Sequence, residues 1–127
     1  MGRVLNIVET AYRGTLEEQD DTVIWLSTML KNNGLEMSLL LRGNAVNYAV
    51  KGQDASGLAF GALKQVHPPE IDKDIAKLVS KDVPVYVVKE DADDRGLAGS
   101  EFVKGIKAIP RARISGLVVD HDQVWHW

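Results

Sequence analysis

Residues 83–97 read VPVYVVKEDADDRGL, a run of six apolar residues that is followed at once by charged ones. A short apolar run of this kind is typical of a strand that is buried on both faces of a parallel sheet. In such sheets, ligands bind beyond the carboxyl ends of the strands, which is where Lys89, Asp91 and Arg95 follow here. The stretch therefore predicts an α/β protein with polar groups at a ligand-binding edge, although it contains no obvious nucleophile.

The rest of the chain alternates in the same way. Strands are predicted at residues 3–10, 35–41, 84–88, 107–109 and 123–127, and helices at 15–32, 44–52, 70–81, 92–95 and from Pro110 onward. Right-handed crossovers between parallel strands place helices on both faces of a sheet. We therefore predict a three-layer α/β/α fold with a mostly parallel sheet of about five strands, formed by residues 1–127 as a single domain.

Three local patterns set the expected helix boundaries. The sequence TLEE at residues 15–18 is a capping-box pattern, which predicts that the first helix starts there, with Asp21 still in its acidic first turn. Gly34 stands in the position that commonly follows a helix end. Asn44 is predicted to cap the second helix, which Lys51 and Gly52 close.

Residues 53–69 show no regular pattern and contain two glycines and the Pro68-Pro69 pair. A loop of this length in a small domain is usually a lid, a binding loop or an oligomer contact. Leu58, Phe60 and Leu63 could either cover the core or pack against a neighbouring subunit. We favour the neighbouring subunit, since a mobile loop otherwise has little reason to be apolar.

Composition excludes several classes of function. The chain has no cysteine, which rules out disulfides, thiolate metal sites and thiol chemistry on the chain itself. Its net charge of −3, with scattered basic residues, gives no electrostatic footprint for nucleic acid. No apolar run is long enough to span a membrane, and the first residues do not resemble a signal peptide. We therefore expect a cytoplasmic protein without nucleic-acid or membrane partners.

The strand-end rule selects the candidate ligand-binding residues, namely Glu9, Tyr12, Arg13, Arg42, Asn44, Asn47, Asp91 and Arg95. Residues 43–45 would place helix amides at a strand end, a geometry that holds phosphate or carboxylate. With Arg42 and Arg13 nearby, this turn is a candidate anion site; the alternative is plain capping by Asn44.

The acids that follow the strand at 84–88 have two interpretations. Glu90, Asp91, Asp93 and Asp94 could act as acid or base or bind a divalent cation, which would make the protein a carboxylate-based, perhaps magnesium-dependent, enzyme. The alternative is that they solvate the loop and stabilise a helix start, where each carboxylate contributes about 0.3–1 kcal/mol without any function. We favour this second interpretation and predict no catalytic residue, metal or cofactor.

The ordered sequence motifs resemble the DsrE/DsrF-like family of small α/β proteins, of the YchN and TusD type. The motifs are IVETAYRGT at 7–15, LLLRGNAVNYAVKGQ at 39–53, the stretch at 83–97 with its Arg95-Gly96 pair, and DHDQVWHW at 120–127. The resemblance covers essentially the whole chain. It implies the three-layer fold, assembly into trimers or hexamers, and a role near bacterial sulfur relay.

The chain departs from that family at one decisive place. Active members are expected to carry a cysteine between the third predicted strand and the Arg-Gly pair, whereas residues 88–94 here read VKEDADD. We also expect the carboxylates of this loop to raise the pKa of any neighbouring thiol and so disfavour sulfur chemistry. The resemblance therefore implies a non-catalytic, homo-oligomeric binding or accessory subunit that holds a partner protein or a small anionic ligand and carries no persulfide itself.

Overall fold

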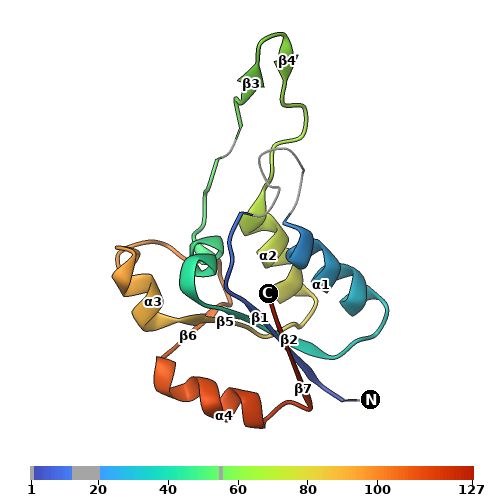
Figure 1. The fold of residues 1–127 in the computed structure, drawn as a ribbon, viewed down its shortest axis with the longest axis vertical. Helices are drawn as coiled ribbons and strands as arrows, with labels where there is room; N and C mark the ends of the chain where they lie inside the picture. The colour runs from blue at the N-terminus through green and yellow to red at the C-terminus, as the bar shows by residue number, and fades with distance from the viewer. Residues whose placement is uncertain (1, 13–20, 55) are drawn as a thin grey trace.

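The computed structural model describes residues 2–12, 21–54 and 56–127 (Figure 1). In chain order, its elements are β1 (Val4–Val8), α1 (Thr22–Asn32), β2 (Met37–Leu41), the 3₁₀ helix η1 (Gly43–Ala49), β3 (Ala59–Phe60), β4 (Leu63–Lys64), α2 (Ile71–Ser80), β5 (Val85–Val88), α3 (Lys89–Asp94), β6 (Lys107–Ile109), the 3₁₀ helix η2 (Arg111–Arg113), α4 (Ile114–Val119) and β7 (Gln123–His126). None of the helices in the described ranges is both long and apolar enough to cross a bilayer.

Five strands form one sheet in the order β6-β5-β2-β1-β7, and every neighbouring pair is parallel. This arrangement confirms the predicted α/β fold class. The chain crosses the sheet in one direction from β1 through β2 and β5 to β6, and then returns to the opposite edge for β7. Because right-handed crossovers that run in opposite directions lie on opposite faces, α4 is separated from α1, α2 and α3.

The two faces of the sheet carry unequal cores. On the first face, α1, α2, α3 and η1 pack over the sheet around fully buried side chains that include Tyr48, Leu39, Ile75 and Leu78. On the second face, the buried cluster consists of Leu5, Ile7, Leu40 and Val88 beneath the apolar side of α4. The sheet is thus thickly covered on one side and thinly covered on the other.

The start of the first helix differs from the prediction. Residues 15–18, which carry the capping-box pattern, lie outside the described residues, and α1 begins at Thr22 with Asp21 as its N-cap. One carboxylate oxygen of Asp21 accepts hydrogen bonds from the amides of Val23 and Ile24, and the other accepts one from the hydroxyl of Tyr48 at 2.5 Å. The buried aspartate therefore takes the capping role. The predicted helix end is confirmed, since Gly34 follows α1 with a φ of 92°.

The prediction that Asn44 caps the second helix is wrong. Arg42 is the N-cap residue of η1, and no side chain caps that helix. The side-chain oxygen of Asn44 instead accepts two hydrogen bonds from Arg95, at 3.0 and 3.1 Å. A charged donor from a distant segment thus outcompetes the local backbone amides.

The helix after β5 begins three residues earlier than predicted, at Lys89. Glu90 and Asp91 therefore lie in the first turn of α3, where negative charge is favourable. At the other predicted boundary, Pro110 precedes η2 as its N-cap residue, and α4 follows directly from η2.

Residues 56–67, here called the arm, form a feature that the sequence pattern did not indicate. β3 and β4 pair antiparallel within it, and the amide of Gln65 donates to the carbonyl of Leu58 at 2.9 Å. The arm projects along the longest axis of the molecule, away from the helices and the sheet (Figure 1). Its side chains Phe60, Leu63 and Val66 are 67%, 75% and 77% exposed, so they do not cover the core.

Candidate functional site

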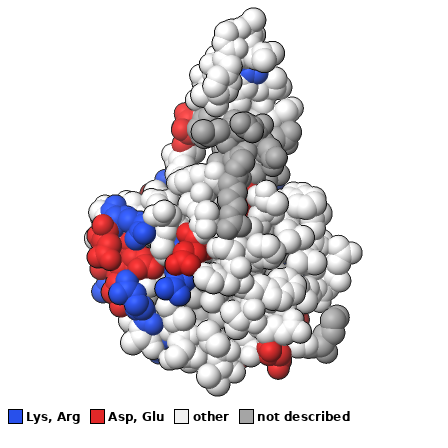
Figure 2. Space-filling model, viewed as in Figure 1, with Lys and Arg blue, Asp and Glu red and all other residues white. Residues whose placement is uncertain are grey.

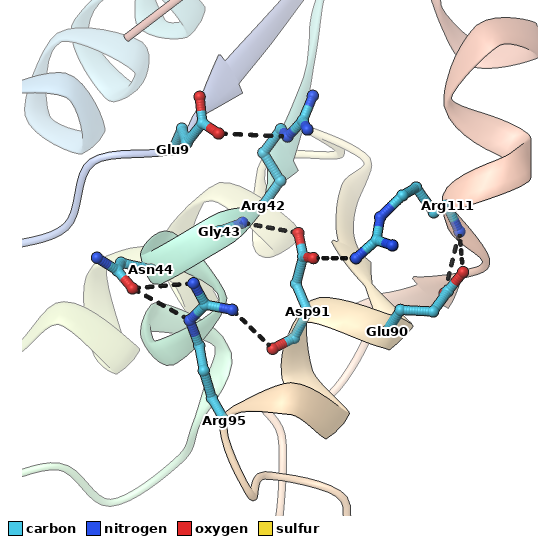
Figure 3. A network of polar contacts seen from close by, with 8 residues as sticks. All are labelled: Glu9, Arg42, Gly43, Asn44, Glu90, Asp91, Arg95 and Arg111. Atoms are coloured by element: carbon cyan, nitrogen blue, oxygen red, sulfur yellow. Dashed lines mark hydrogen bonds and ion pairs between the residues drawn. The ribbon is translucent and has the colours of Figure 1, made fainter.

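Polar side chains and one backbone amide gather where β1, β2, β5 and β6 end. We call this group the strand-end cluster; its members are Glu9, Arg42, Gly43, Asn44, Glu90, Asp91, Arg95 and Arg111 (Figure 3). Figure 2 shows basic and acidic side chains intermixed in one patch on the corresponding side of the molecule, below the arm. The cluster lies at the edge where parallel α/β sheets bind their ligands.

Asp91 is the centre of the cluster and is 8% exposed. One of its carboxylate oxygens accepts a hydrogen bond from the amide of Gly43 at 2.8 Å, and the other accepts one from the guanidinium of Arg111 at 2.6 Å. Burial alone would raise the pKa of Asp91, but the Gly43 amide, Arg111 and Arg95 together hold it below its ordinary value. The first turn of α3 is thereby fastened to η1 and η2 through one carboxylate.

Arg95 ties the end of α3 to the same corner. Its guanidinium donates to the side-chain oxygen of Asn44 and to the backbone carbonyl of Asp91 at 3.1 Å. The segment before Arg95 therefore faces the turn that contains Asn44, as the strand-end rule requires. Glu90 completes the link on the other side, since its carboxylate accepts from the amide of Arg111 at 2.9 and 3.0 Å.

Arg42 makes fewer hydrogen bonds and ion pairs with the described residues than Arg95 and Arg111, the other cations of the cluster. Its Nε lies 3.8 Å from a carboxylate oxygen of Glu9, while the second oxygen of Glu9 is 2.8 Å from a ring nitrogen of His126. Nε of Arg42 is buried without a hydrogen-bond partner among the described residues. The side chain as a whole is 34% exposed, so part of it remains accessible from solvent. A buried donor in this condition is costly unless something accepts from it.

Gly43 is required at the turn between β2 and η1. Its φ is +55°, and a Cβ built there would lie 3.0 Å from Cγ of Glu9. Any larger residue would therefore be strained and would push Glu9 away from Arg42. The glycine brings its amide to Asp91 and leaves room for Glu9.

Two of the three remaining predicted residues, Tyr12 and Asn47, lie beside the cluster rather than in it. Tyr12 has a positive φ of 59°, its amide donates to the hydroxyl of Tyr48, and its own hydroxyl donates to Gln53 at 2.9 Å. Asn47 supports the backbone of η1 by donating to the carbonyl of Asn44 at 2.8 Å. Arg13 lies outside the described residues.

The arrangement bears on the alternative of a carboxylate-based metal enzyme. In the described parts of the chain, no three His, Asp or Glu side chains are grouped so that they could hold a metal ion. Both oxygens of Asp91 already accept from N–H donors, and Glu9 is engaged with Arg42 and His126. A cation at Asp91 would have to displace the Gly43 amide and Arg111.

Arg111 and His126 were missed as site residues. Both follow from the strand-end rule, because Arg111 comes two residues after β6 and His126 is the last residue of β7. Edge strands are short and their register is hard to assign from sequence, so the rule was applied only to the three central strands. The Pro110-Arg111 pair directly after the strand was the available signal.

At position 91 the surroundings favour an anion, contrary to the expectation for this loop. We therefore expect the thiol of an Asp91→Cys variant to titrate below ~8.5, the ordinary cysteine value, because the Gly43 amide and Arg111 would favour the thiolate. Asp93→Cys is the matched control, since Asp93 lies exposed on the same helix and its replacement also removes one carboxylate. Ultraviolet absorbance of the thiolate against pH measures both. Equal pKa values would contradict the prediction.

Neither a family model nor a curated protein matches this sequence. Several solved structures are similar to it, and two of them are described here. The ychN protein from E. coli superposes with a TM-score of 0.76 at 18% identity, with 100% of each chain covered. MTH1491, a protein of unknown function from Methanobacterium thermoautotrophicum, superposes with a TM-score of 0.67 at 11% identity, with 98% of each chain covered. At these identities the likeness concerns the fold, and it agrees with the resemblance that the sequence motifs indicated. The chain therefore has the DsrE-like fold of these two structures.

Proposed function

We propose that this protein is a non-catalytic accessory subunit that binds a small anion, or an anionic group of a partner protein, at the strand-end cluster. In this proposal it is related to bacterial sulfur-relay proteins, acts in the cytoplasm and works as a homo-oligomer, either a trimer or a hexamer. It carries no persulfide itself, since its sequence has no cysteine. The fold and the ordered motifs support the relationship, and the chemistry of the cluster supports the ligand class.

The observation that supports an anionic ligand is the incomplete hydrogen bonding of Arg42. The other charged groups of the cluster are engaged: Asp91 with Gly43 and Arg111, Arg95 with Asn44, and Glu90 with Arg111. Arg42 has one distant ion pair and a buried Nε without an acceptor among the described residues. An anion with two or three oxygens would supply the missing acceptors in the paired geometry that a guanidinium favours.

The position of Asp91 limits where that ligand can bind. Its carboxylate already accepts the hydrogen bond of the Gly43 amide, which the sequence predicts to be part of the anion site. The ligand is therefore expected at the open side of Arg42, next to Glu9, rather than on the amides of η1. Glu9 would favour a protonated or monovalent anion there over a highly charged one, because like charges repel at close range.

Replacing Arg42 with glutamine is expected to weaken anion binding about 10–100-fold, the loss of one or two hydrogen bonds to a charged group. Isothermal titration of the full chain at pH 6 with phosphate, which is mostly monovalent there, and with acetate and sulfate in turn measures the effect. Lys31→Gln is the charge-matched control, since Lys31 lies at the far end of α1. Equal affinities of the two variants, or no binding of any of the three anions by the unaltered chain, would contradict the ligand part of the proposal.

Native mass spectrometry tests the assembly part, and a monomer would contradict it.

A further inference from the structure

His126 lies in line with Glu9 and Arg42 at one side of the strand-end cluster. Its Nε2 is 2.8 Å from one carboxylate oxygen of Glu9, and the other oxygen of Glu9 is 3.8 Å from Nε of Arg42. The three residues stand at the ends of β7, β1 and β2, which are neighbours in the sheet. Figure 3 shows Glu9 facing Arg42 in this way. Glu9 therefore separates the histidine from the arginine at which we expect the anion.

The ring of His126 can change its charge without losing its contact with Glu9. An ionised carboxylate only accepts hydrogen bonds, so Nε2 carries a hydrogen atom toward Glu9 in both protonation states of the ring. The proton that comes and goes is therefore the one on Nδ1. That atom makes no hydrogen bond with the described residues, and the side chain is 54% exposed, so it is open to solvent.

The elements packed around His126 bring no second titrating group to the ring. Ile7, its partner in the register of β1 and β7, belongs to the cluster on the second face of the sheet, so the ring lies on that face. The covering helix α4 has the sequence ISGLVV, which contains no charged residue. The next histidine, His121, lies toward the opposite end of the strands, where its ring binds the hydroxyl of Ser38.

The net charge of the three side chains therefore depends on His126. With a neutral ring, the charges of Arg42 and Glu9 sum to zero, and with a protonated ring the sum is one positive charge. The other ionised groups of the cluster are carboxylates and guanidinium groups, which ordinarily stay charged between pH 5.5 and 8. The same holds for a carboxylate at Trp127, whose oxygen accepts from the amide of Glu9 at 2.9 Å. A histidine ordinarily titrates near ~6.5, inside this range.

We propose that His126 determines which anions the site at Arg42 accepts. This inference rests on the proposed function and names the residue that controls its ligand class. A protonated His126 offsets the negative charge of Glu9, so the site binds divalent oxyanions. With a neutral His126, the charge of Glu9 is no longer offset, and the site favours monovalent anions. Because Coulomb energies scale with the charge of the ligand, the effect of the histidine is larger for a divalent anion.

Isothermal titration of the full chain with sulfate and with nitrate, at pH 5.5 and at pH 8, tests this assignment. Neither anion changes its own charge in this range. We expect sulfate to bind about 10-fold more tightly at pH 5.5 than at pH 8, and nitrate about 3-fold, the effect of one unit charge near an exposed site.

Three variants separate the charge of His126 from its structural contact. His126→Gln keeps a donor for Glu9 but stays neutral, so it should bind sulfate at both pH values as weakly as the unaltered chain does at pH 8. His126→Lys keeps a positive charge, so it should bind sulfate tightly at both. His67→Gln is the matched control, since His67 is exposed and makes no hydrogen bond or ion pair with the described residues. It should retain the full pH dependence.

Proton uptake gives a second measurement, which needs no variant. Near pH 6.5, sulfate binding is expected to take up a fraction of a proton, seen as a dependence of the binding heat on the ionisation enthalpy of the buffer. No uptake, equal affinities at the two pH values, or a pH dependence that persists in His126→Gln would each overturn this inference and leave the anion site standing. No binding of sulfate or nitrate at either pH overturns this inference. If phosphate and acetate also fail to bind, the proposed function fails with it.

Discussion

Replacing Asp21 with alanine is expected to lower the free energy of unfolding by about 2–4 kcal/mol. Loss of an N-cap side chain costs ~1 kcal/mol, and leaving a buried polar partner unsatisfied costs a further ~1–3 kcal/mol. Both losses apply here, because the carboxylate of Asp21 caps α1 and also accepts from the fully buried Tyr48. Urea unfolding followed by circular dichroism measures the change.

A double-mutant cycle with Tyr48→Phe separates the two contributions. Burial and the neighbouring Asp21 both raise the pKa of Tyr48, so its hydroxyl stays protonated and donates to Asp21 throughout the neutral range. Removing that hydroxyl alone is expected to destabilise the chain by about 1–3 kcal/mol, because Asp21 and the amide of Tyr12 each lose a partner. The double variant should then lose less than the sum of the two single losses. Strict additivity would show that the two residues act independently.

Replacing Asp91 with asparagine is expected to lower the free energy of unfolding by about 1–3 kcal/mol at neutral pH. The charged acceptor of Arg111 and of the Gly43 amide becomes a neutral amide that can accept only through one oxygen. Asp93→Asn is the control, since Asp93 is exposed two residues further along α3 and its side chain makes no hydrogen bond or ion pair with the described residues. A loss as large in the control would assign the effect to the general loss of a negative charge on α3 rather than to the cluster.

The same variant should respond differently to acid. The folded-state pKa of Asp91 is lowered below its unfolded value, so the carboxylate contributes its full stability above ~3.9 and loses it as the pH falls through the folded value. The unaltered chain is therefore expected to lose stability more steeply than Asp91→Asn below about pH 4. There the two plots of the free energy of unfolding against pH should converge. Parallel curves down to pH 2 would contradict the assigned role of the carboxylate.

The sheet and its long helices were predictable because their signals are local. Apolar runs of strand length and the period of Ile71, Ile75 and Leu78 each follow from burial, and the pattern needs no knowledge of the neighbours. The wrong predictions of helix caps depend instead on contacts between residues that are far apart in the sequence. Asp21 caps α1 and also accepts a hydrogen bond from Tyr48, 27 residues away. The side chain of Asn44 binds Arg95, 51 residues away, instead of capping η1. Contacts at such separations leave no trace in a short window of sequence.

The sequence predicted which residues gather at the candidate site, but it did not predict the hydrogen bonds and ion pairs between them. The strand-end rule selected Glu9, Arg42, Asn44, Asp91 and Arg95, which the structure places together. It did not indicate that Asp91 would bind the Gly43 amide and so fill the turn that was expected to hold an anion. The arm was missed for a related reason: two-residue strands carry no periodic pattern, and the glycines beside them, Gly57 and Gly61, argue against a regular element of any length.

The pairing of β1 with β7 has a consequence for how the protein is made. The register joins Val4 to Gln123 and Ile7 to His126, so the two strands lie side by side although almost the whole chain separates them. During synthesis β1 can gain β2 as a neighbour early, but its other edge must wait for the final strand. Closing contacts across so long a span is slow, and an unpaired strand edge invites association with other chains. The nascent chain is therefore most exposed to association with other chains while one edge of β1 is still unpaired.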